Sequence, residues 1–459
     1  MLHFRELMAP SLPVRPRSSP GIAAFLSFIW PGLGEFYVGQ RPRALLFALP
    51  VLVLVLLVAW QASGGLDVFA LRLLDPAVAV AALVIVVALG FWRIVSVLGA
   101  WRLAGGGRRV AAEGRVLLTV LIVAVLGMHA IAGWYAYAFY DAANQIFVGN
   151  TPGGASGSPG APSPSSSDNG GDFGATPDPS ARAAGSRVTF LVTGVDSGHG
   201  RDHALTDTLL VVSVDPLAKT AVMISVPRDV SNVPLYLGGT YNDKINSLMT
   251  YAGNHPQQFP DGPIGTLTRE LGYLLGTPVT YFAAINLEGF QSMVDLVGGI
   301  DVDNPRQISD ATYDWFDGTY GFHLTAGQHH LTGRTALAYA RSRKGVGDDD
   351  FTRAGRQQQL LIALRQKLTQ PAMLIRLPAL LDAAAKVIRT NVPVDRVADL
   401  LAEAKDVPAS SIDRYVLEAP YATHPPTDST GGVYTLVLDM VKVKALSIQL
   451  FGAQSTYYP

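Results

Sequence analysis

Three long apolar runs in the first third of the sequence constrain the fold most. They cover residues 43–60, 77–98 and 116–140 and contain almost no charged side chains. Each is close to the roughly 20 residues that an α-helix needs to cross the hydrocarbon core of a bilayer. The sequence therefore predicts three membrane-spanning helices.

A fourth apolar stretch, residues 21–39, differs from these runs. It carries Glu35 and is interrupted by Pro31, Gly32 and Gly34. Such a segment suits a re-entrant or interfacial position better than a full span. Its sequence PGLGEFYVGQ resembles the short motif of TM2-type membrane domains. A tight turn in a helical hairpin is the simplest role for this motif.

The distribution of arginines predicts the orientation of the chain. Basic residues gather before the first span and between the second and third spans: Arg5, Arg15, Arg17, Arg41 and Arg43, then Arg102, Arg108, Arg109 and Arg115. The positive-inside rule places both regions in the cytoplasm. An odd number of spans then puts the N-terminus, residues 1–20, in the cytoplasm and the large C-terminal domain outside the cell membrane.

Beyond the membrane region, residues 21–140, the composition changes twice. Residues 149–186 are dominated by Gly, Ser, Pro, Ala and Asp. They have too few apolar side chains to offset the entropy of ordering, which predicts a disordered linker. Residues 187–459 alternate apolar and polar side chains as a soluble domain does. The net charge of −1 gives no argument for nucleic acid, and zero cysteines exclude disulfides and thiolate metal sites.

Charged residues converge on one edge of a predicted sheet. Residues 188–195, 208–214 and 220–226 are short β-branched runs with short connections, which favours an antiparallel meander. In a meander, the end of the first strand, the start of the second and the end of the third share one edge. These positions are occupied by Asp196, Asp207, Arg228 and Asp229. Asp and Pro also mark ordinary turns. Charged residues at all three strand ends of one sheet edge nevertheless favour a functional site over turns alone.

A second group of candidate side chains lies downstream. Its members are Arg341, Arg343, Arg353, Arg356 and Gln357. The chain from Arg353 has helical composition, so Arg353, Arg356 and Gln357 share one helical face. Guanidinium groups suit phosphate oxygens. The alternative is a solvated face balanced by a flexible acidic loop, residues 348–350, which is the commoner outcome for mixed charge runs.

Together these motifs resemble the LytR-CpsA-Psr family. They are G-V-D (194–196), T-D-T (206–208), S-V-P-R-D (225–229), K-I-N (244–246), V-D-L-V-G-G-I (294–300), L-T-G-R-T-A-L-A-Y-A-R-S-R (331–343) and D-F-T-R-A-G-R-Q-Q (350–358). The resemblance covers about residues 187–368. Members of this family transfer glycopolymers from polyprenyl-pyrophosphate carriers to the cell wall, usually to peptidoglycan. The resemblance therefore implies a membrane-anchored phosphotransferase.

The resemblance also implies roles for individual residues. Asp196 and Asp207 would hold Mg²⁺ or Mn²⁺. The pyrophosphate would be gripped by Arg228, Arg341, Arg343, Arg353 and Gln357, with Arg356 and Lys244 as further candidates. The family usually has Arg two residues before the second metal aspartate, where this chain has Leu205. Arg201 or His203 could substitute for it, or the ligand could bind more weakly.

Two chemical questions stay open in the sequence. Asp229 could act as general base on a sugar hydroxyl beside Arg228, or it could orient Arg228 through a salt bridge. The alternatives to glycopolymer transfer are hydrolysis of the same pyrophosphate by water and a non-catalytic membrane sensor that binds polyprenyl phosphates. No nucleic-acid partner is expected.

The expected fold is an all-α multi-span membrane region followed by an α/β domain. Residues 187–370 would form this catalytic domain as a mixed β-sheet flanked by helices. Within it, helices are predicted at 267–276 and 287–297, with a strand at 279–285 between them. A helical C-terminal extension would occupy residues 371–459, with helices at 378–388 and 394–405.

Overall fold

The structure is a computed structural model, and it describes residues 18–106, 112–146, 187–196, 205–315, 317–345, 347–370, 372–426 and 433–459. The predicted linker at residues 149–186 and the loop residues Arg201 and His203 lie outside these ranges. The chain forms two compact units, Met1–Gly64 with Ala77–Tyr137 and Gly65–Pro76 with Ala138–Pro459.

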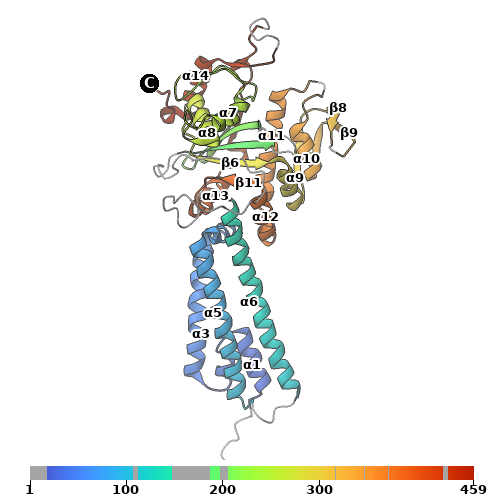
Figure 1. Cartoon of the computed structure of the whole chain (residues 1–459). Helices are drawn as coiled ribbons and strands as arrows, with labels where there is room; N and C mark the ends of the chain where they lie inside the picture. The colour runs from blue at the N-terminus through green and yellow to red at the C-terminus, as the bar shows by residue number, and fades with distance from the viewer. Residues whose placement is uncertain are drawn as a thin grey trace, which may run out of the picture. The chain divides into compact units, whose positions relative to one another are not determined.

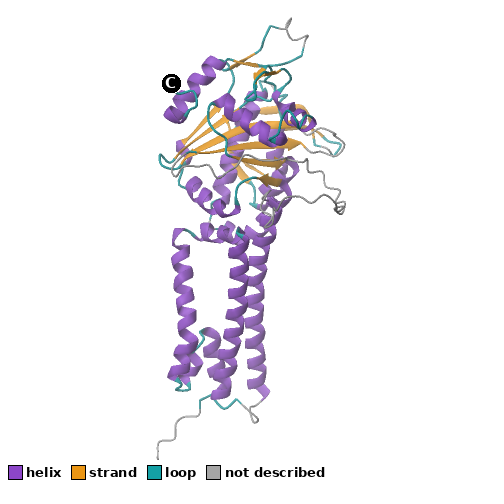
Figure 2. Cartoon of the chain, turned by 60° about the vertical axis from the view of Figure 1, so that its left-hand side comes forward, coloured by secondary structure: helices purple, strands orange, loops and turns teal. Residues whose placement is uncertain are grey.

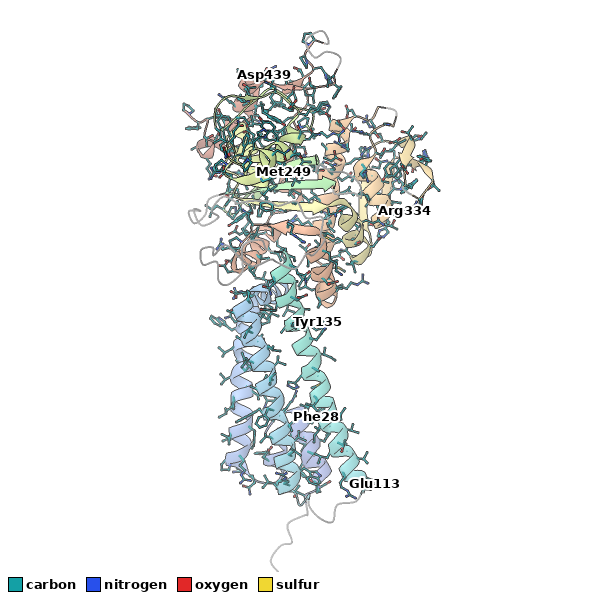
Figure 3. All side chains as sticks on the ribbon, viewed as in Figure 1. Phe28, Glu113, Tyr135, Met249, Arg334 and Asp439 are labelled. Atoms are coloured by element: carbon teal, nitrogen blue, oxygen red, sulfur yellow. The ribbon has the colours of Figure 1, made fainter. Side chains whose placement is uncertain are left out.

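The N-terminal region is helical (Figure 1). The α-helices described in this region are α1 (Pro20–Ile29), α2 (Leu33–Tyr37), α3 (Arg41–Gln61), α4 (Leu66–Leu71), α5 (Pro76–Leu103) and α6 (Ala112–Ile146). Three of them, α3, α5 and α6, are long and apolar enough to cross a membrane. Most apolar side chains of these three point away from any protein core, as Figure 3 shows. Exposed apolar surface on this scale fits a lipid environment, and the expected helical membrane region is confirmed.

The stretch around Glu35 forms two short helices, α1 and α2, joined by a turn. The Glu35 carboxylate is buried and accepts hydrogen bonds from Ser27 Oγ at 2.7 Å and from Ser96 Oγ of α5 at 3.1 Å. Gly34 is required beside it, because a Cβ there would overlap the carbonyl oxygen of Ala23. The glycine motif therefore builds a tight hairpin whose acidic side chain is satisfied by hydroxyl groups inside the helical unit.

The C-terminal unit is built on a six-stranded mixed sheet (Figure 2). In spatial order its strands are β11 (Ile388–Thr390), β6 (Tyr281–Asn286), β1 (Val188–Asp196), β2 (Leu205–Asp215), β3 (Thr220–Ser225) and β12 (Ile412–Val416). β1, β2 and β3 pair antiparallel, whereas β6 runs parallel to β1 and β12 parallel to β3. The predicted meander and the mixed sheet are confirmed.

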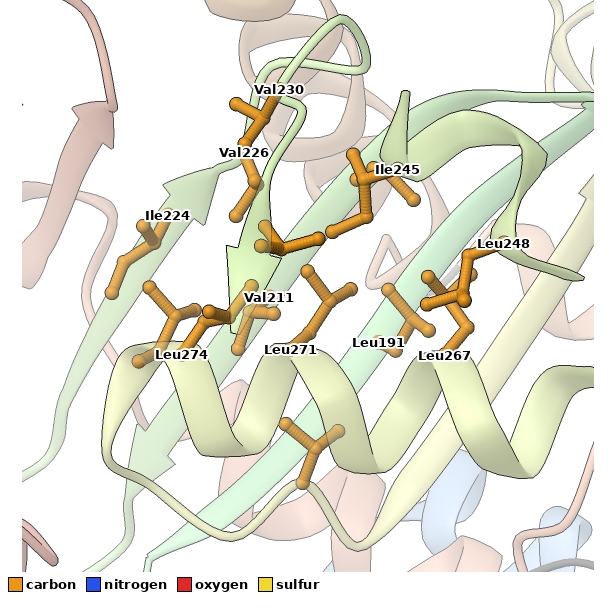
Figure 4. Close-up of a cluster of buried hydrophobic side chains, with 14 of the residues drawn as sticks. Leu191, Val211, Ile224, Val226, Val230, Ile245, Leu248, Leu267, Leu271 and Leu274 are labelled. Atoms are coloured by element: carbon orange, nitrogen blue, oxygen red, sulfur yellow. The ribbon is translucent and has the colours of Figure 1, made fainter. Parts of the chain in front are cut away.

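Two hydrophobic cores hold the helices in place. In the first, Leu191, Val211 and Ile224 of the central strands meet Leu267 and Leu271 of α8 (Figure 4). This core also includes side chains of α7 (Leu248–Asn254), α8 (Gly262–Leu275) and α14 (Met440–Phe451). The second core joins α9 (Leu287–Leu296), α10 (Gly333–Arg341), α11 (Asp350–Leu368), α12 (Met373–Val387), β7 (Ile300–Asn304) and β10 (Gly327–Leu331). Helices thus flank the sheet as predicted.

Short strand pairs and one further helix complete the unit. The pairs are β4 (Val233–Pro234) with β5 (Thr240–Tyr241), β8 (Ile308–Asp314) with β9 (Tyr320–Leu324), and β13 (Ala422–Thr423) with β14 (Val437–Leu438). The helix α13 comprises Val397–Lys405. These pairs lie outside the central sheet.

The C-terminal extension corrects one expectation. The sequence predicts helices in residues 371–459, and α12, α13 and α14 are present, but this segment also supplies β11 and β12 at the two edges of the central sheet. These strands have only 3 and 5 residues. Runs this short carry too little alternation of apolar and polar residues to be recognised from the sequence.

One buried acid in α8 predicts a pH-dependent stability. Glu270 is fully buried, and burial raises its pKa to about 7 from a usual 4.5, although its Oε2 accepts the N–H of Tyr236 at 3.2 Å. As the pH rises from 4.5 to 7, the unfolded chain ionises while the folded chain keeps the proton, so the folded state loses stability. Above pH 7 the loss of folding free energy is complete. It amounts to about 3 kcal/mol, because each unit of pKa difference corresponds to about 1.36 kcal/mol.

Glu270→Gln removes this titration. Between about pH 4 and pH 8, we expect the wild type to lose about 3 kcal/mol of unfolding free energy relative to the variant. Denaturant unfolding of the full chain in detergent at both pH values measures it. A difference that stays constant with pH would show that Glu270 ionises normally.

Candidate functional site

Asp207 lies at an irregularity where β1 ends and β2 begins. Gly194 pairs with Thr208, but the next residue, Val195, pairs with Thr206, so Asp207 sits in a β-bulge. Bulges redirect side chains and are frequent beside active sites. Asp196, the last residue of β1, pairs with Leu205, so its backbone lies at the same edge of the sheet, while its side chain is outside the described part of the chain.

Arg228 lies among three carboxylates just after β3. Its Nη1 donates a hydrogen bond to Asp207 Oδ1 at 2.5 Å. Its Nε lies 3.5 Å from Asp229 Oδ2 and 3.7 Å from Asp350 Oδ2. Burial lowers the pKa of Arg228, but attraction to the carboxylates, above all to Asp207, outweighs burial and the net pKa is raised. The guanidinium therefore stays charged and is fixed in direction.

Lys244 connects a further loop to these residues. Lys244 directly precedes the short helix Ile245–Ser247. Its Nζ donates a hydrogen bond to Asp229 Oδ1 at 2.6 Å. Burial raises the pKa of Asp229, but the hydrogen bond from Lys244 and the charge of Arg228 outweigh burial and lower it. Asp229 is thus held as a carboxylate between two cations.

Helix α11 brings Asp350 and Arg353 to the same place. The helix starts here because Asp349 caps it in a capping box, accepting the N–H of Thr352 at 2.7 Å. Arg353 Nη2 lies 3.3 Å from Asp350 Oδ1 and 3.4 Å from the carbonyl oxygen of Asp207. Burial lowers the pKa of Arg353 and raises that of Asp350, whose carboxyl also adjoins the negative Asp229.

These contacts define a charged cluster. Its six members are Asp207, Arg228, Asp229, Lys244, Asp350 and Arg353. Within the described residues, three of its buried atoms, Arg228 Nε, Arg353 Nε and Asp350 Oδ1, make no hydrogen bond. Arg228 Nε and Asp350 Oδ1 instead face opposite charges at 3.3–3.7 Å, whereas Arg353 Nε retains an N–H that could bind a polar ligand.

The other predicted arginines behave differently. Arg356 is buried. Its Nη1 donates to both carboxylate oxygens of Asp348, at 3.0 and 2.9 Å, and its Nη2 donates to the carbonyl oxygen of Ser342. Gln357 donates to the carbonyl oxygen of Ala340 at 3.3 Å. Both side chains therefore tie the end of α10 to α11.

Arg341 is the last residue of α10, and Arg343 follows Ser342, whose carbonyl oxygen accepts the hydrogen bond from Arg356. The charge of Arg341 acts on Tyr313 of β8, and the Arg343 side chain is exposed. The structure thus unites Arg228 with Arg353 through Asp350, and Arg341 and Arg343 flank Ser342 at the end of α10.

The expected acidic loop, residues 348–350, makes specific side-chain contacts in the structure. Asp348 is almost fully buried against Arg356, Asp349 caps α11, and Asp350 joins the charged cluster. The sequence interpretation missed Asp350. Its spacing three residues before Arg353, at a helix start marked by Asp349 and Thr352, is the signal that could have identified it.

Carboxylates suited to a hard cation are present at this edge. Asp207 keeps about a quarter of its side chain exposed while one oxygen accepts from Arg228. Asp196 is the last residue of the neighbouring strand. Across the described side chains, which leave out that of Asp196, no group of three metal-ligating residues comes together. One or two carboxylates completed by phosphate oxygens and water match how Mg²⁺ usually binds.

Comparison with known proteins places this chain in a family. A TagU of Bacillus anthracis, named polyisoprenyl-teichoic acid–peptidoglycan teichoic acid transferase, is 31% identical over 226 residues, which is 49% of this chain and 67% of the relative. A relative of the same name in Halalkalibacterium halodurans is 31% identical, over 46% of this chain and 63% of the relative.

Solved structures and a family model extend the comparison. The crystal structure of B. subtilis TagV is 24% identical with a TM-score of 0.46, covering 60% of this chain and 100% of that chain. A structure of TagT bound to LIIa-WTA is 23% identical with a TM-score of 0.42, covering 60% and 91%. The sequence model of the LytR_cpsA_psr family matches residues 165–450, well over half of the sequence, and this chain therefore belongs to the LytR_cpsA_psr family.

Proposed function

We propose that this chain is a membrane-anchored phosphotransferase that moves a glycopolymer from a polyprenyl-pyrophosphate carrier to peptidoglycan. The observation that carries the proposal is the charged cluster, in which Asp207, Arg228, Lys244 and Arg353 meet from four separate segments. Membership of the family and the names of the TagU relatives support the same reaction.

The cations of the cluster are suited to a pyrophosphate. Arg228 and Arg353 offer planar forks that match phosphate oxygens, and Lys244 adds a compact charge. We assign the pyrophosphate to these three residues first, because their charges converge. Arg341 and the exposed Arg343 extend the positive charge along the adjoining helix end, whereas Arg356 and Gln357 hold that end in position.

Asp207 and Asp196 are the proposed ligands of Mg²⁺ or Mn²⁺. Both belong to strand ends at one sheet edge, and hard cations prefer carboxylate oxygens. When bound, the cation neutralises charge on the phosphates and polarises a phosphoryl oxygen. Leu205 pairs with Asp196 at the position where the family usually has arginine, and within the described part of the chain Arg228 donates a hydrogen bond to Asp207.

Transfer requires a proton acceptor. A sugar hydroxyl oxygen forms a bond to phosphorus, the P–O bond to the polyprenyl phosphate breaks, and the hydroxyl proton passes to a base. Two adjacent carboxyls whose pKa values are pushed apart divide such roles. Asp229, with its lowered pKa, positions Arg228 and Lys244; Asp350, with its raised pKa, takes the proton.

This assignment predicts a pH profile. Because only the ionised form of Asp350 accepts a proton, kcat rises with pH through its raised pKa and then levels off. Asp350→Asn should lower kcat by about 10²–10⁴ and abolish the rising limb. Initial rates between pH 4 and 9 measure both effects. A limb that survives in Asp350→Asn but disappears in Asp229→Asn would make Asp229 the base.

The proposed orientation places the catalytic unit outside the membrane and the N-terminus in the cytoplasm. The chain has no cysteine, so each introduced cysteine is unique. We expect an impermeant maleimide to label Leu217→Cys, at a highly exposed position after β2, in intact cells. Glu113→Cys, at the start of α6, should react only after permeabilisation. The reverse pattern would overturn the orientation.

One assay separates this function from its alternatives. The full chain in detergent is incubated with Mg²⁺, a glycan carried on polyprenyl pyrophosphate, and peptidoglycan. We expect glycan on peptidoglycan and polyprenyl monophosphate in equal amounts. Polyprenyl monophosphate with free glycan phosphate would identify a pyrophosphatase. Saturable binding of the lipid without turnover would identify a sensor.

A further inference from the structure

The C-terminal segment, which carries none of the family motifs, contacts the charged cluster through its backbone. Leu436 forms a parallel bridge with Val230, and its N–H donates to the carbonyl oxygen of Asp229 at 3.0 Å. The N–H of Ser231 donates to the carbonyl oxygen of Leu436 at 2.8 Å. Residues 434–438 are therefore fixed to the loop that carries Arg228 and Asp229.

Tyr434 is placed over the cluster by this arrangement. Lys244 Nζ lies 6.0 Å from the centroid of the Tyr434 ring, at the same ammonium that bonds Asp229. Burial raises the pKa of the Tyr434 hydroxyl, and the nearby charges of Asp350 and Asp229 raise it further. About half of the side chain, 49%, is nevertheless exposed. The ring thus borders the cluster and still presents surface to a ligand.

His424 holds the ring in this position. The two rings meet edge to face, with centroids 4.3 Å apart, and His424 Nδ1 lies 2.9 Å from the carbonyl oxygen of Thr435. His424 directly follows β13 and Tyr434 precedes β14, two strands that pair through Thr423 and Val437. An aromatic side chain with few rotamers, braced by a second ring, offers a rigid surface.

The chemistry of this surface fits a sugar ring. Polyphosphate has no apolar face, so an aromatic surface adds nothing to its binding, whereas a pyranose has an apolar C–H face and a rim of hydroxyl groups. Beside Tyr434, the carboxyls of Asp229 and Asp350 supply acceptors for hydroxyl groups. A sugar bound on this ring would therefore lie near the carboxyl that we assign as the proton acceptor.

We propose that Tyr434, braced by His424, forms the subsite for the acceptor sugar, a pyranose of the peptidoglycan glycan chain. This inference rests on the proposed function. Tyr434 acts as a positioning and binding residue for the acceptor, and it has no part in holding the pyrophosphate. The segment that carries Tyr434 thereby contributes to recognition of the acceptor.

The test compares the Michaelis constants of the full chain for its two substrates. A soluble peptidoglycan fragment is varied at saturating lipid donor, and the lipid donor is varied at saturating fragment. Tyr434→Ala should raise the KM for the fragment about tenfold, while the KM for the donor moves less than about twofold. Tyr434→Leu, which keeps apolar volume without a ring, should show the same split, and Tyr434→Phe should recover most of the lost affinity.

The matched control is Tyr320→Ala, which removes a tyrosine that is 69% exposed on β9. It should leave both constants unchanged. An unchanged KM for the fragment in active Tyr434→Ala and Tyr434→Leu overturns the subsite and leaves the proposed function standing. A parallel rise in both constants also overturns it, because Tyr434 would then act on the donor. A wild-type chain that transfers nothing overturns the proposed function and the subsite together.

Discussion

Arg228→Ala should lower kcat/KM for glycopolymer transfer by at least about 10³. One positioned donor to a developing charge is worth about 10²–10³ in rate, and Arg228 also separates Asp207, Asp229 and Asp350. Without it, three carboxylates adjoin and repel the pyrophosphate. Initial rates at saturating and limiting lipid donor measure the loss.

The control for this change is Arg269→Ala. Arg269 forms a half-exposed ion pair with Asp261 at 3.0 Å, and pairs of this kind contribute little. Its activity should match the wild type. Arg228→Lys keeps the charge but loses the planar fork, so it should recover only part of the rate. Full activity in Arg228→Lys would show that charge alone is required, and full activity in Arg228→Ala would remove Arg228 from the site.

Asp207→Asn is expected to have the second large effect. Its carboxylate is a proposed cation ligand and the closest partner of Arg228, so the amide weakens both interactions. We expect kcat/KM to fall by about 10²–10³, and the Mg²⁺ concentration for half-maximal rate to rise at least about tenfold. A titration of Mg²⁺ from a chelator-treated baseline measures both.

Asp382→Asn is the matched control, because Asp382 pairs with Lys386 on the exposed surface of α12. Its Mg²⁺ dependence should equal that of the wild type. A wild-type rate that is unaffected by chelators would contradict the cation proposal. A normal Mg²⁺ requirement in Asp207→Asn would move the cation to other ligands.

Strand direction explains why part of the site could be predicted from the sequence. Asp207 and Arg228 follow from a meander whose ends share one edge, and the structure brings them to 2.5 Å. Periodicity also identified the helix that carries Arg353, because a helical face is a local property. Local patterns do not say which loop meets that helix, so only the family resemblance linked Arg353 to Arg228.

The remaining residues depend on contacts between distant segments. Lys244 reaches Asp229 through a loop whose course the sequence does not specify. Tyr434 reaches the cluster because Leu436 pairs with Val230, about 200 residues away in the chain. Short edge strands such as β11 and β12 are fixed by the sheet they join, so their own residues carry little signal.

The membrane region was the easier part to predict. Length and apolar composition alone identify α3, α5 and α6, because the thickness of the bilayer sets the length of a span. The role of Glu35 needed the structure, since Ser96 lies 61 residues away in another helix. Hydroxyl partners for a buried carboxylate cannot be inferred from spacing along the chain.

A double-mutant cycle tests the central claim that distant arginines share one pyrophosphate site. Binding of a polyprenyl pyrophosphate to the full chain is measured for wild type, Arg228→Ala, Arg353→Ala and the double variant. Residues in one network couple by about 0.5–3 kcal/mol, so the double loss should differ from the sum of the single losses by that amount. Strictly additive losses, or unchanged binding in either single variant, would contradict a shared site.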